Sequence, residues 1–156
     1  MVLSILVMRI DDPQISSRFE VRDGRPGTGL GLFALVPIKK DDFVIEYTGT
    51  RLPTAIADES ESAYLFELDK DWTIDGPVPA NTAGYINHDC HPNTETDVVD
   101  GKIIFEAIKD IAPGDELTVD YGEEYFDEFI RPNGCKCASC ARGVPSPHDK
   151  KAKKTA

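Results

Sequence analysis

The sequence predicts one mostly β domain with short helices, on three observations. Its 156 residues suffice for one domain with a hydrophobic core and are too few for two of ordinary size. Hydrophobic residues make up 40% and charged residues 29% of the chain, as in ordinary globular proteins. Short runs of β-branched and aromatic residues recur between turn-forming residues, whereas long helical periodicity is scarce. No apolar run reaches the ~20 residues that a membrane-spanning helix needs, so we expect no membrane association.

The expected elements begin with the apolar residues 1–10. This stretch lacks the basic leader and cleavage site of a signal peptide, so it predicts a first strand. Residues 54–63 form the one predicted helix, with Thr54 as a candidate N-cap and three alanines that favour helix. Asp69–Asp71 is expected to form the turn of a hairpin. Further strands are predicted at residues 32–37, 43–47, 64–68, 72–74, 102–108 and 117–121.

The formal net charge of −11 restricts the classes of partner. Nonspecific nucleic-acid binding needs a basic face that displaces counterions, so we expect no direct nucleic-acid binding. An acidic surface instead attracts a cationic partner. Residues 115–128 hold seven carboxylates and no Lys or Arg, which indicates either such a binding surface or a merely solubilising one. The Lys-rich residues 150–154 predict a disordered tail.

Three of the four cysteines lie close together, at Cys135, Cys137 and Cys140. Because no export signal is evident, we expect an intracellular protein, cytoplasmic or nuclear, in which disulfides are rare. Metal ligation is therefore the favoured role for the cluster. A zinc-dependent structural or interaction protein is one function that it allows.

Glycine is concentrated in residues 24–31, which indicates close approach of the backbone to another group. The segment is not a Walker loop, because no Lys-Ser/Thr follows its last glycine. It is not a dinucleotide-binding loop either, because the spacing differs and the following residues are strand-like. Taken alone, the segment predicts a tight turn.

Several motifs gain meaning from their order along the chain. Gly29-Leu-Gly31 is followed by Glu46-Tyr-Thr-Gly49, by Asn87-His-Asp-Cys-His-Pro-Asn93, by Glu116-Leu-Thr-Val-Asp-Tyr121 and by the cysteine cluster. In this order they resemble the SET-domain family of protein-lysine methyltransferases, over about residues 19–142. The resemblance implies small β-sheets with a C-terminal pseudoknot, in which the Asn-His segment is threaded under a loop. Such threading departs from the usual rule for chain connections.

The resemblance also implies a division of the chain. Residues 1–18 are an N-terminal strand or extension, 19–130 the SET domain, 131–143 a post-SET zinc segment and 144–156 a disordered basic tail. Cofactor and peptide are expected to enter from opposite faces and to meet through a narrow channel.

The roles of individual residues follow from the same resemblance. Tyr121 is the expected catalytic tyrosine, and Tyr47 and Tyr64 are expected to wall the lysine channel, with Tyr125 either lining it or packing. Zinc is expected on all four cysteines, with Cys90 of the Asn-His motif as the fourth ligand. The residues expected to hold S-adenosylmethionine are Gly29, Leu30, Gly31, Tyr64, Asn87, His88 and Tyr121.

Three positions depart from the family pattern. Leu30 replaces a usual tryptophan, and Gly84 replaces a usual arginine, which removes one expected contact to the cofactor carboxylate. Val119 stands where the family usually carries tyrosine or phenylalanine. Residues two apart on a strand share a face, so Val119 is expected beside Tyr121 and is the candidate determinant of how many methyl groups are added.

The function that we predict is S-adenosylmethionine-dependent methylation of lysine in a basic protein of the histone or ribosomal type. The amine must be neutral to attack, and an apolar channel beside a sulfonium charge lowers its pKa from about 10.4. A catalytically silent SET module that binds a basic peptide is the alternative in another class.

Overall fold

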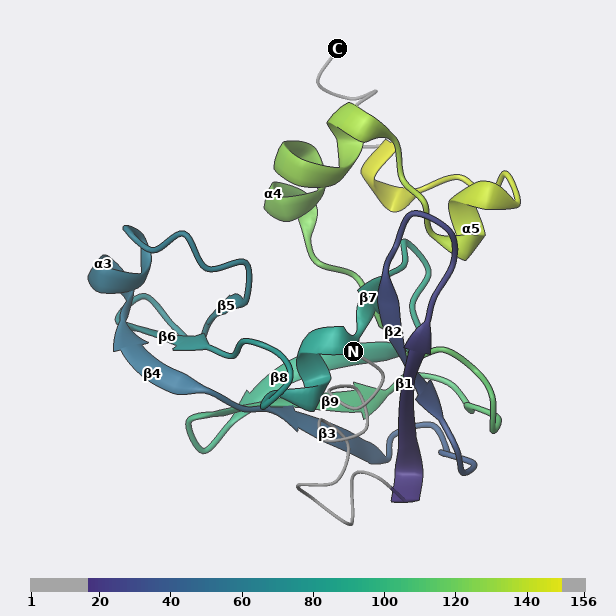
Figure 1. Cartoon of the computed structure of the whole chain (residues 1–156), viewed down its shortest axis with the longest axis horizontal. Coiled ribbons are helices and arrows are strands. Elements are labelled where there is room, and N and C mark those ends of the chain that lie inside the picture. Colours follow the sequence, from purple (N-terminus) through teal and green to yellow (C-terminus); the bar gives the residue numbers. More distant parts are fainter. Residues whose placement is uncertain (1–16, 150–156) are drawn as a thin grey trace.

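The computed structural model describes residues 17–149. The predicted strand at residues 1–10 and the lysines at 150–154 lie outside the described residues. Within them, the predicted fold class is confirmed: the described chain forms four small β-sheets and several short helices (Figure 1). None of the helices in residues 17–149 has the length and apolar character needed to cross a bilayer.

The first sheet pairs β1 (Phe19–Asp23) with β2 (Leu30–Ala34) in antiparallel register. The predicted strand at residues 32–37 thus starts two residues earlier and ends three earlier, and β1 was not predicted. The intervening turn is closed by the Gly24 N–H, which donates to the Gly29 carbonyl at 2.8 Å. Gly29 has a φ of +70°, a conformation that L side chains rarely adopt. The glycine-rich segment is therefore a tight turn, as its composition predicts.

The central sheet has the order β3 (Phe43–Tyr47), β9 (Lys102–Ala107) and β8 (Thr94–Val99). Strands β8 and β9 form a hairpin through Asp100 and Gly101, whose φ values are both positive, as tight hairpin turns require. The predicted strands at residues 43–47 and 102–108 are confirmed, the second ending one residue early.

The third sheet has the order β4 (Thr50–Pro53), β6 (Trp72–Asp75) and β5 (Leu65–Glu67). The predicted turn between β5 and β6 is confirmed, because the Asp69 carboxylate accepts the N–H groups of Asp71 and Trp72. With helix α3, these strands project from the body as an arm (Figure 1).

The predicted helix at residues 54–63 is much shorter. Helix α3 covers only Thr54–Ala57, its N-cap is Pro53, and the Thr54 hydroxyl bonds to Thr73 instead of capping. The Ser60 and Ser62 hydroxyls accept backbone N–H groups two residues further on. Such side-chain-to-backbone bonds compete with helix formation.

The fourth sheet is the short parallel pair of β7 (Asn87–His88) and β10 (Thr118–Val119). This pair brings the Asn-His motif against the segment that ends in Tyr121, as the resemblance predicts. The predicted strand at residues 117–121 is thus reduced to two residues. The remaining helical segments are η1 (Thr82–Tyr85), α4 (Glu123–Tyr125), η2 (Phe126–Ile130), η3 (Arg131–Asn133) and α5 (Ala138–Ala141).

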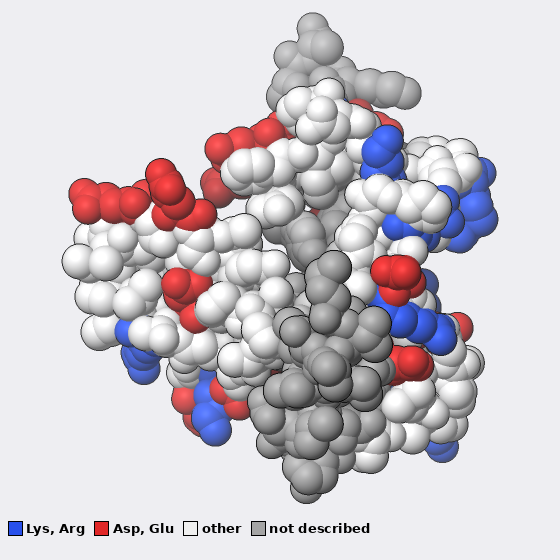
Figure 2. All heavy atoms as spheres, viewed as in Figure 1, with Lys and Arg blue, Asp and Glu red and all other residues white. Residues whose placement is uncertain are grey.

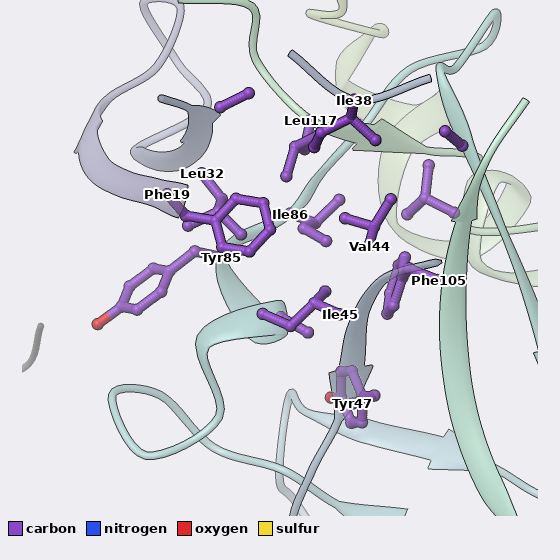
Figure 3. Close-up of a cluster of buried hydrophobic side chains, with 14 of the residues drawn as sticks. Phe19, Leu32, Ile38, Val44, Ile45, Tyr47, Tyr85, Ile86, Phe105 and Leu117 are labelled. Atoms are coloured by element: carbon purple, nitrogen blue, oxygen red, sulfur yellow. The ribbon is translucent and has the colours of Figure 1, made fainter. Parts of the chain in front are cut away.

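The hydrophobic core joins these sheets (Figure 3). Leu32, Ile103 and Leu117 come from three different strands or loops and are fully buried. Burial of one such side chain contributes roughly 1.5–3 kcal/mol. Ile86, which immediately precedes the Asn-His motif, belongs to the same core, so the motif is anchored to it directly.

The end of the described chain is packed against the body. Ser146 and His148 are 1% and 6% exposed, although they fall in the segment predicted to be a disordered tail. The local sequence is polar and proline-rich and does not predict this burial. The partner of Ser146 is Cys90, 56 residues earlier, and that of His148 is Asp120, 28 residues earlier.

Candidate active site and cysteine cluster

Tyr121 is held at both ends. Its hydroxyl donates to the Ile86 carbonyl at 2.6 Å, and its backbone N–H donates to His88 Nδ1 at 3.0 Å. Gly122, with a φ of +97°, then turns the chain from β10 into α4. Burial of the hydroxyl raises the pKa of Tyr121, so the phenol stays neutral at physiological pH.

His88 connects Tyr121 to the cysteines. Because Nδ1 accepts the Tyr121 N–H, the ring proton of the neutral imidazole lies on Nε2. Nε2 is 3.4 Å from the Cys90 sulfur and therefore donates to it. Burial lowers the pKa of His88, which agrees with a neutral ring. Both ring nitrogens are thus engaged, so hydrogen bonds from His88 to a ligand would come from its backbone.

A cavity of about 730 Å³ lies in front of Tyr121. The glycine-rich turn, the arm and the segment around Tyr121 each contribute to its walls. The lining includes most residues that the sequence assigned to the site: Gly29, Leu30, Tyr47, Tyr64, Asn87, Val119, Tyr121 and Tyr125.

The tyrosines around this cavity are ordered by contacts with one another. The Tyr47 hydroxyl donates to the Tyr64 carbonyl at 2.6 Å, and burial raises its pKa. Tyr125 meets Tyr121 edge-on, with ring centroids 5.0 Å apart. Tyr125 therefore lines the cavity and remains 39% exposed; it is not a core residue.

A second cavity of about 320 Å³ lies between His88 and the cysteine segment. It shares Thr28, Asn87, Tyr121 and Tyr125 with the larger cavity, so these residues form the wall between the two. Phe129 and Ile130 line it and were not predicted as site residues. Tyr125 and Phe129 are four residues apart, so a helix places both on one face, and this spacing could have predicted Phe129 as a site residue. In the structure their ring centroids lie 4.8 Å apart.

Asn87 ties the glycine-rich turn to this wall. Its amide nitrogen donates to the Leu30 carbonyl at 3.0 Å and to a Glu116 carboxylate oxygen at 2.9 Å. The carbonyl oxygen of the same amide is the group left to accept a ligand amino group. Position 31 requires glycine because a Cβ there would collide with the Glu116 side chain. This packing accounts for Gly31 without a ligand.

The four cysteine sulfurs lie within 4.8 Å of one another. The Cys90 sulfur is 3.8 Å from that of Cys135 and 3.7 Å from that of Cys140. Four thiolates around one zinc ion at ~2.3 Å are separated by about 3.8 Å. The cluster therefore can hold a tetrahedral zinc ion.

The protonation of these thiols depends on the metal. Burial raises the pKa of Cys90 to about 12, and it also raises the pKa of Cys135 and of Cys140. Burial works against the Cys137 thiolate as well, but hydrogen bonds, including one from the Cys140 N–H, lower its pKa. Without metal, most of these thiols therefore keep their protons at pH 7.

The family model described as the SET domain matches residues 29–122. The chain belongs to the SET-domain family. The match runs from the glycine-rich turn to Gly122 and so contains the Asn-His motif and Tyr121.

Curated proteins with related sequences include two that are named histone-lysine N-methyltransferases. Over 123 residues and 70% of its length, the chain is 41% identical to "Histone-lysine N-methyltransferase, H3 lysine-4 specific" of Schizosaccharomyces pombe. Over 127 residues and 73% of its length, it is 34% identical to "Histone-lysine N-methyltransferase trr" of Drosophila melanogaster. The chain spans only 13% and 5% of the length of these relatives.

Two solved structures with a similar fold also have related sequences. "ctPRC2 in an autoinhibited conformation bound to S-adenosylmethionine" matches 69% of this chain with a TM-score of 0.59 and 31% identity. The polycomb repressive complex 2 of Chaetomium thermophilum matches 65% with a TM-score of 0.55 and 32% identity. Each match covers 15% of the longer chain.

One departure from the SET-domain pattern has a local explanation. A Cβ at Gly84 would lie 2.8 Å from a methyl group of Val78 and 3.3 Å from the Asn81 amide. The position where the family usually carries arginine is therefore closed to a larger side chain unless Val78 moves.

Proposed function

We propose that this chain is an S-adenosylmethionine-dependent protein-lysine N-methyltransferase. The observation that carries the proposal is the position of Tyr121, whose ring stands in the wall between the two cavities. The smaller cavity, beside the cysteine segment, is assigned to the adenosine end of S-adenosylmethionine. The larger one is assigned to the methionine end and the substrate lysine, which meet at Tyr121.

These residues are proposed to position the substrate lysine and the methyl donor and to exclude water from them. S-Adenosylmethionine supplies an electrophilic methyl group on sulfur. A neutral lysine amine is needed, and its usual pKa of about 10.4 makes this cost roughly 4–5 kcal/mol at pH 7. The aromatic lining from Tyr47, Phe66 and Phe105 excludes water and lowers that cost. Alignment of amine, methyl and sulfur then accounts for the rate, and no strong protein base is required.

The zinc ion is proposed to be structural. Cys90 belongs to the Asn-His motif, whereas the other three ligands come from the segment after η3, so a shared ion would join the two parts of the site. The sulfur separations support this assignment.

A basic protein is the proposed substrate. The exposed carboxylates of Asp58, Glu59 and Glu61 directly precede cavity residues of the arm, and Glu123 and Glu124 lie between Tyr121 and Tyr125. Figure 2 shows acidic side chains at the outer edge of the arm and on the projection above it. Two acidic rims attract a Lys-rich peptide to the cavity between them.

A histone is the first candidate, because the related proteins are named histone-lysine methyltransferases. We therefore also propose a nuclear location, with a cytoplasmic target such as a ribosomal protein as the second candidate.

Transfer of labelled methyl from S-adenosylmethionine to mixed histones and ribosomal proteins tests the function. We expect label on lysine, and we expect the same label to disappear from a reaction with Tyr121→Phe protein. Binding of S-adenosylmethionine without transfer to any basic protein would instead support the catalytically silent module.

Val119 predicts the extent of methylation. Its side chain lines the same cavity as Tyr121, is smaller than tyrosine or phenylalanine and offers no hydrogen bond to the amine. We therefore expect di- or trimethyl-lysine as the product. Mass spectrometry of a peptide time course with excess S-adenosylmethionine measures this, and a product that stops at one methyl group contradicts it.

Val119→Tyr is the matched variant. A hydroxyl at this position would hold the amine or a water molecule and fill space near it, so the product is expected to shift toward monomethyl-lysine. Val119→Ile, which adds volume without a hydroxyl, separates the two effects.

A further inference from the structure

The segment Val144–Asp149 closes over the junction between the cysteine cluster and the Tyr121 segment. The Ser146 hydroxyl donates to the Cys90 sulfur at 3.2 Å. Arg131 donates to the His148 carbonyl at 3.2 Å and pairs with Asp149 at 3.8 Å. The bonds of the Ser146 hydroxyl and of the His148 carbonyl hold the backbone around His148, whose own side chain is almost fully buried, whereas the Asp149 ion pair is longer and exposed.

The His148 ring has two partners in this position. Its Nε2 lies 2.9 and 3.0 Å from the two carboxylate oxygens of Asp120. Because carboxylate oxygens only accept, Nε2 carries the proton and donates. The ring also stacks on Phe126 of η2, with centroids 4.4 Å apart and planes 17° apart. The hydrogen bond and the stack together allow the ring one orientation.

Asp120 connects His148 to the backbone on the far side of Tyr121. Its Oδ1 accepts the Gly122 N–H at 2.9 Å, across Tyr121. Tyr121 is thus fixed from one side by the His88 ring, which accepts its N–H, and from the other by the Asp120–Gly122 bond, which His148 orients. The angle at which the Tyr121 ring enters the cavity wall depends on both.

We infer that His148 is a positioning residue for methyl transfer, acting through Asp120 on Tyr121. His148 is then part of the site and does not belong to a dispensable tail. The expected effect of His148 on turnover rests on the proposed function. Its expected effect on the Tyr121 backbone does not depend on that function.

A cation site formed by His88, Asp120 and His148 is excluded by the same contacts. The three side chains lie close enough to share an ion. However, the Nδ1 lone pair of His88 is occupied by the Tyr121 N–H, and His148 Nε2 carries a proton. Each ring nitrogen that faces Asp120 is therefore already engaged, that of His88 by the Tyr121 N–H and that of His148 by donating to Asp120.

Two substitutions separate the hydrogen bond from the packing. His148→Phe keeps a ring against Phe126 and loses the donor to Asp120, whereas His148→Gln keeps a donor and loses the stack. Asp149→Asn is the matched control, because it weakens an exposed ion pair of the same segment and leaves His148 in place.

For His148→Phe we expect kcat to fall about 10-fold with the KM values for peptide and S-adenosylmethionine within about twofold of wild type. His148→Gln should recover most of kcat, and Asp149→Asn should retain it. Zinc content and melting temperature should stay close to wild type in all three. Wild-type kcat in His148→Phe, or an equal loss in Asp149→Asn, would overturn the inference.

Amide hydrogen exchange of Tyr121 and Gly122 provides a readout that needs no activity. We expect both amides to exchange at least several-fold faster in His148→Phe and not in Asp149→Asn. If wild-type protein methylates nothing, the proposed function fails, and the exchange rates alone decide the inference. Unchanged exchange in His148→Phe then refutes it.

Discussion

Tyr121→Phe is expected to lower kcat by about 10²–10³-fold while the fold and S-adenosylmethionine binding are retained. Loss of one preorganised polar group at a reacting centre has this typical effect. The ring contacts with Tyr125 and His88 persist in the variant, so the shape of the cavity wall is unchanged. Single-turnover kinetics and calorimetric titration with S-adenosylmethionine measure the two quantities separately.

The lost hydroxyl also leaves the Ile86 carbonyl without its partner, which costs about 1 kcal/mol of stability. Tyr47→Phe is the comparison, because it removes a hydroxyl with an equally short bond to a carbonyl, that of Tyr64. We expect a similar stability loss and a smaller kinetic loss in Tyr47→Phe. Turnover at the wild-type rate in Tyr121→Phe would show that Tyr121 is not the catalytic tyrosine.

Removal of zinc is expected to abolish activity. Purified protein should contain one zinc ion per chain, and a strong chelator should reduce activity below detection. Residues 131–149 should then lose their protection from proteolysis, since the cysteine cluster joins this segment to the Asn-His motif. Re-addition of zinc should restore both. A fully active, metal-free preparation would contradict the assignment of the four cysteines.

Zinc binding is also expected to depend on pH. The metal-free thiols of Cys90, Cys135 and Cys140 have raised pKa values, so they must lose protons when zinc binds. Affinity therefore falls as pH is lowered, and zinc binding releases protons at pH 7. Calorimetric titrations of zinc in buffers with different ionisation enthalpies count the protons released. Cys140→Ser should lower both the affinity and that count.

The sequence by itself determined the family and the fold class, and most of the residues that it assigned to the site line the two cavities. Local patterns were sufficient for strands β3 and β9 and for the turn at Asp69–Asp71, because β-branched, aromatic and turn-forming residues act over a few positions. The functional motifs were visible because their chemistry needs specific residue types in a fixed order.

Only the tertiary structure decided how those residues are connected. The proton on His88 is fixed by the Tyr121 backbone, and the role of His148 depends on Asp120, 28 residues earlier. The predicted helix at residues 54–63 is mostly absent for a related reason. The Thr54 hydroxyl hydrogen-bonds to Thr73 of β6, and serine side chains accept the backbone N–H groups of residues 62 and 64. Propensity acts between neighbours in sequence, whereas these bonds join groups that only folding brings together.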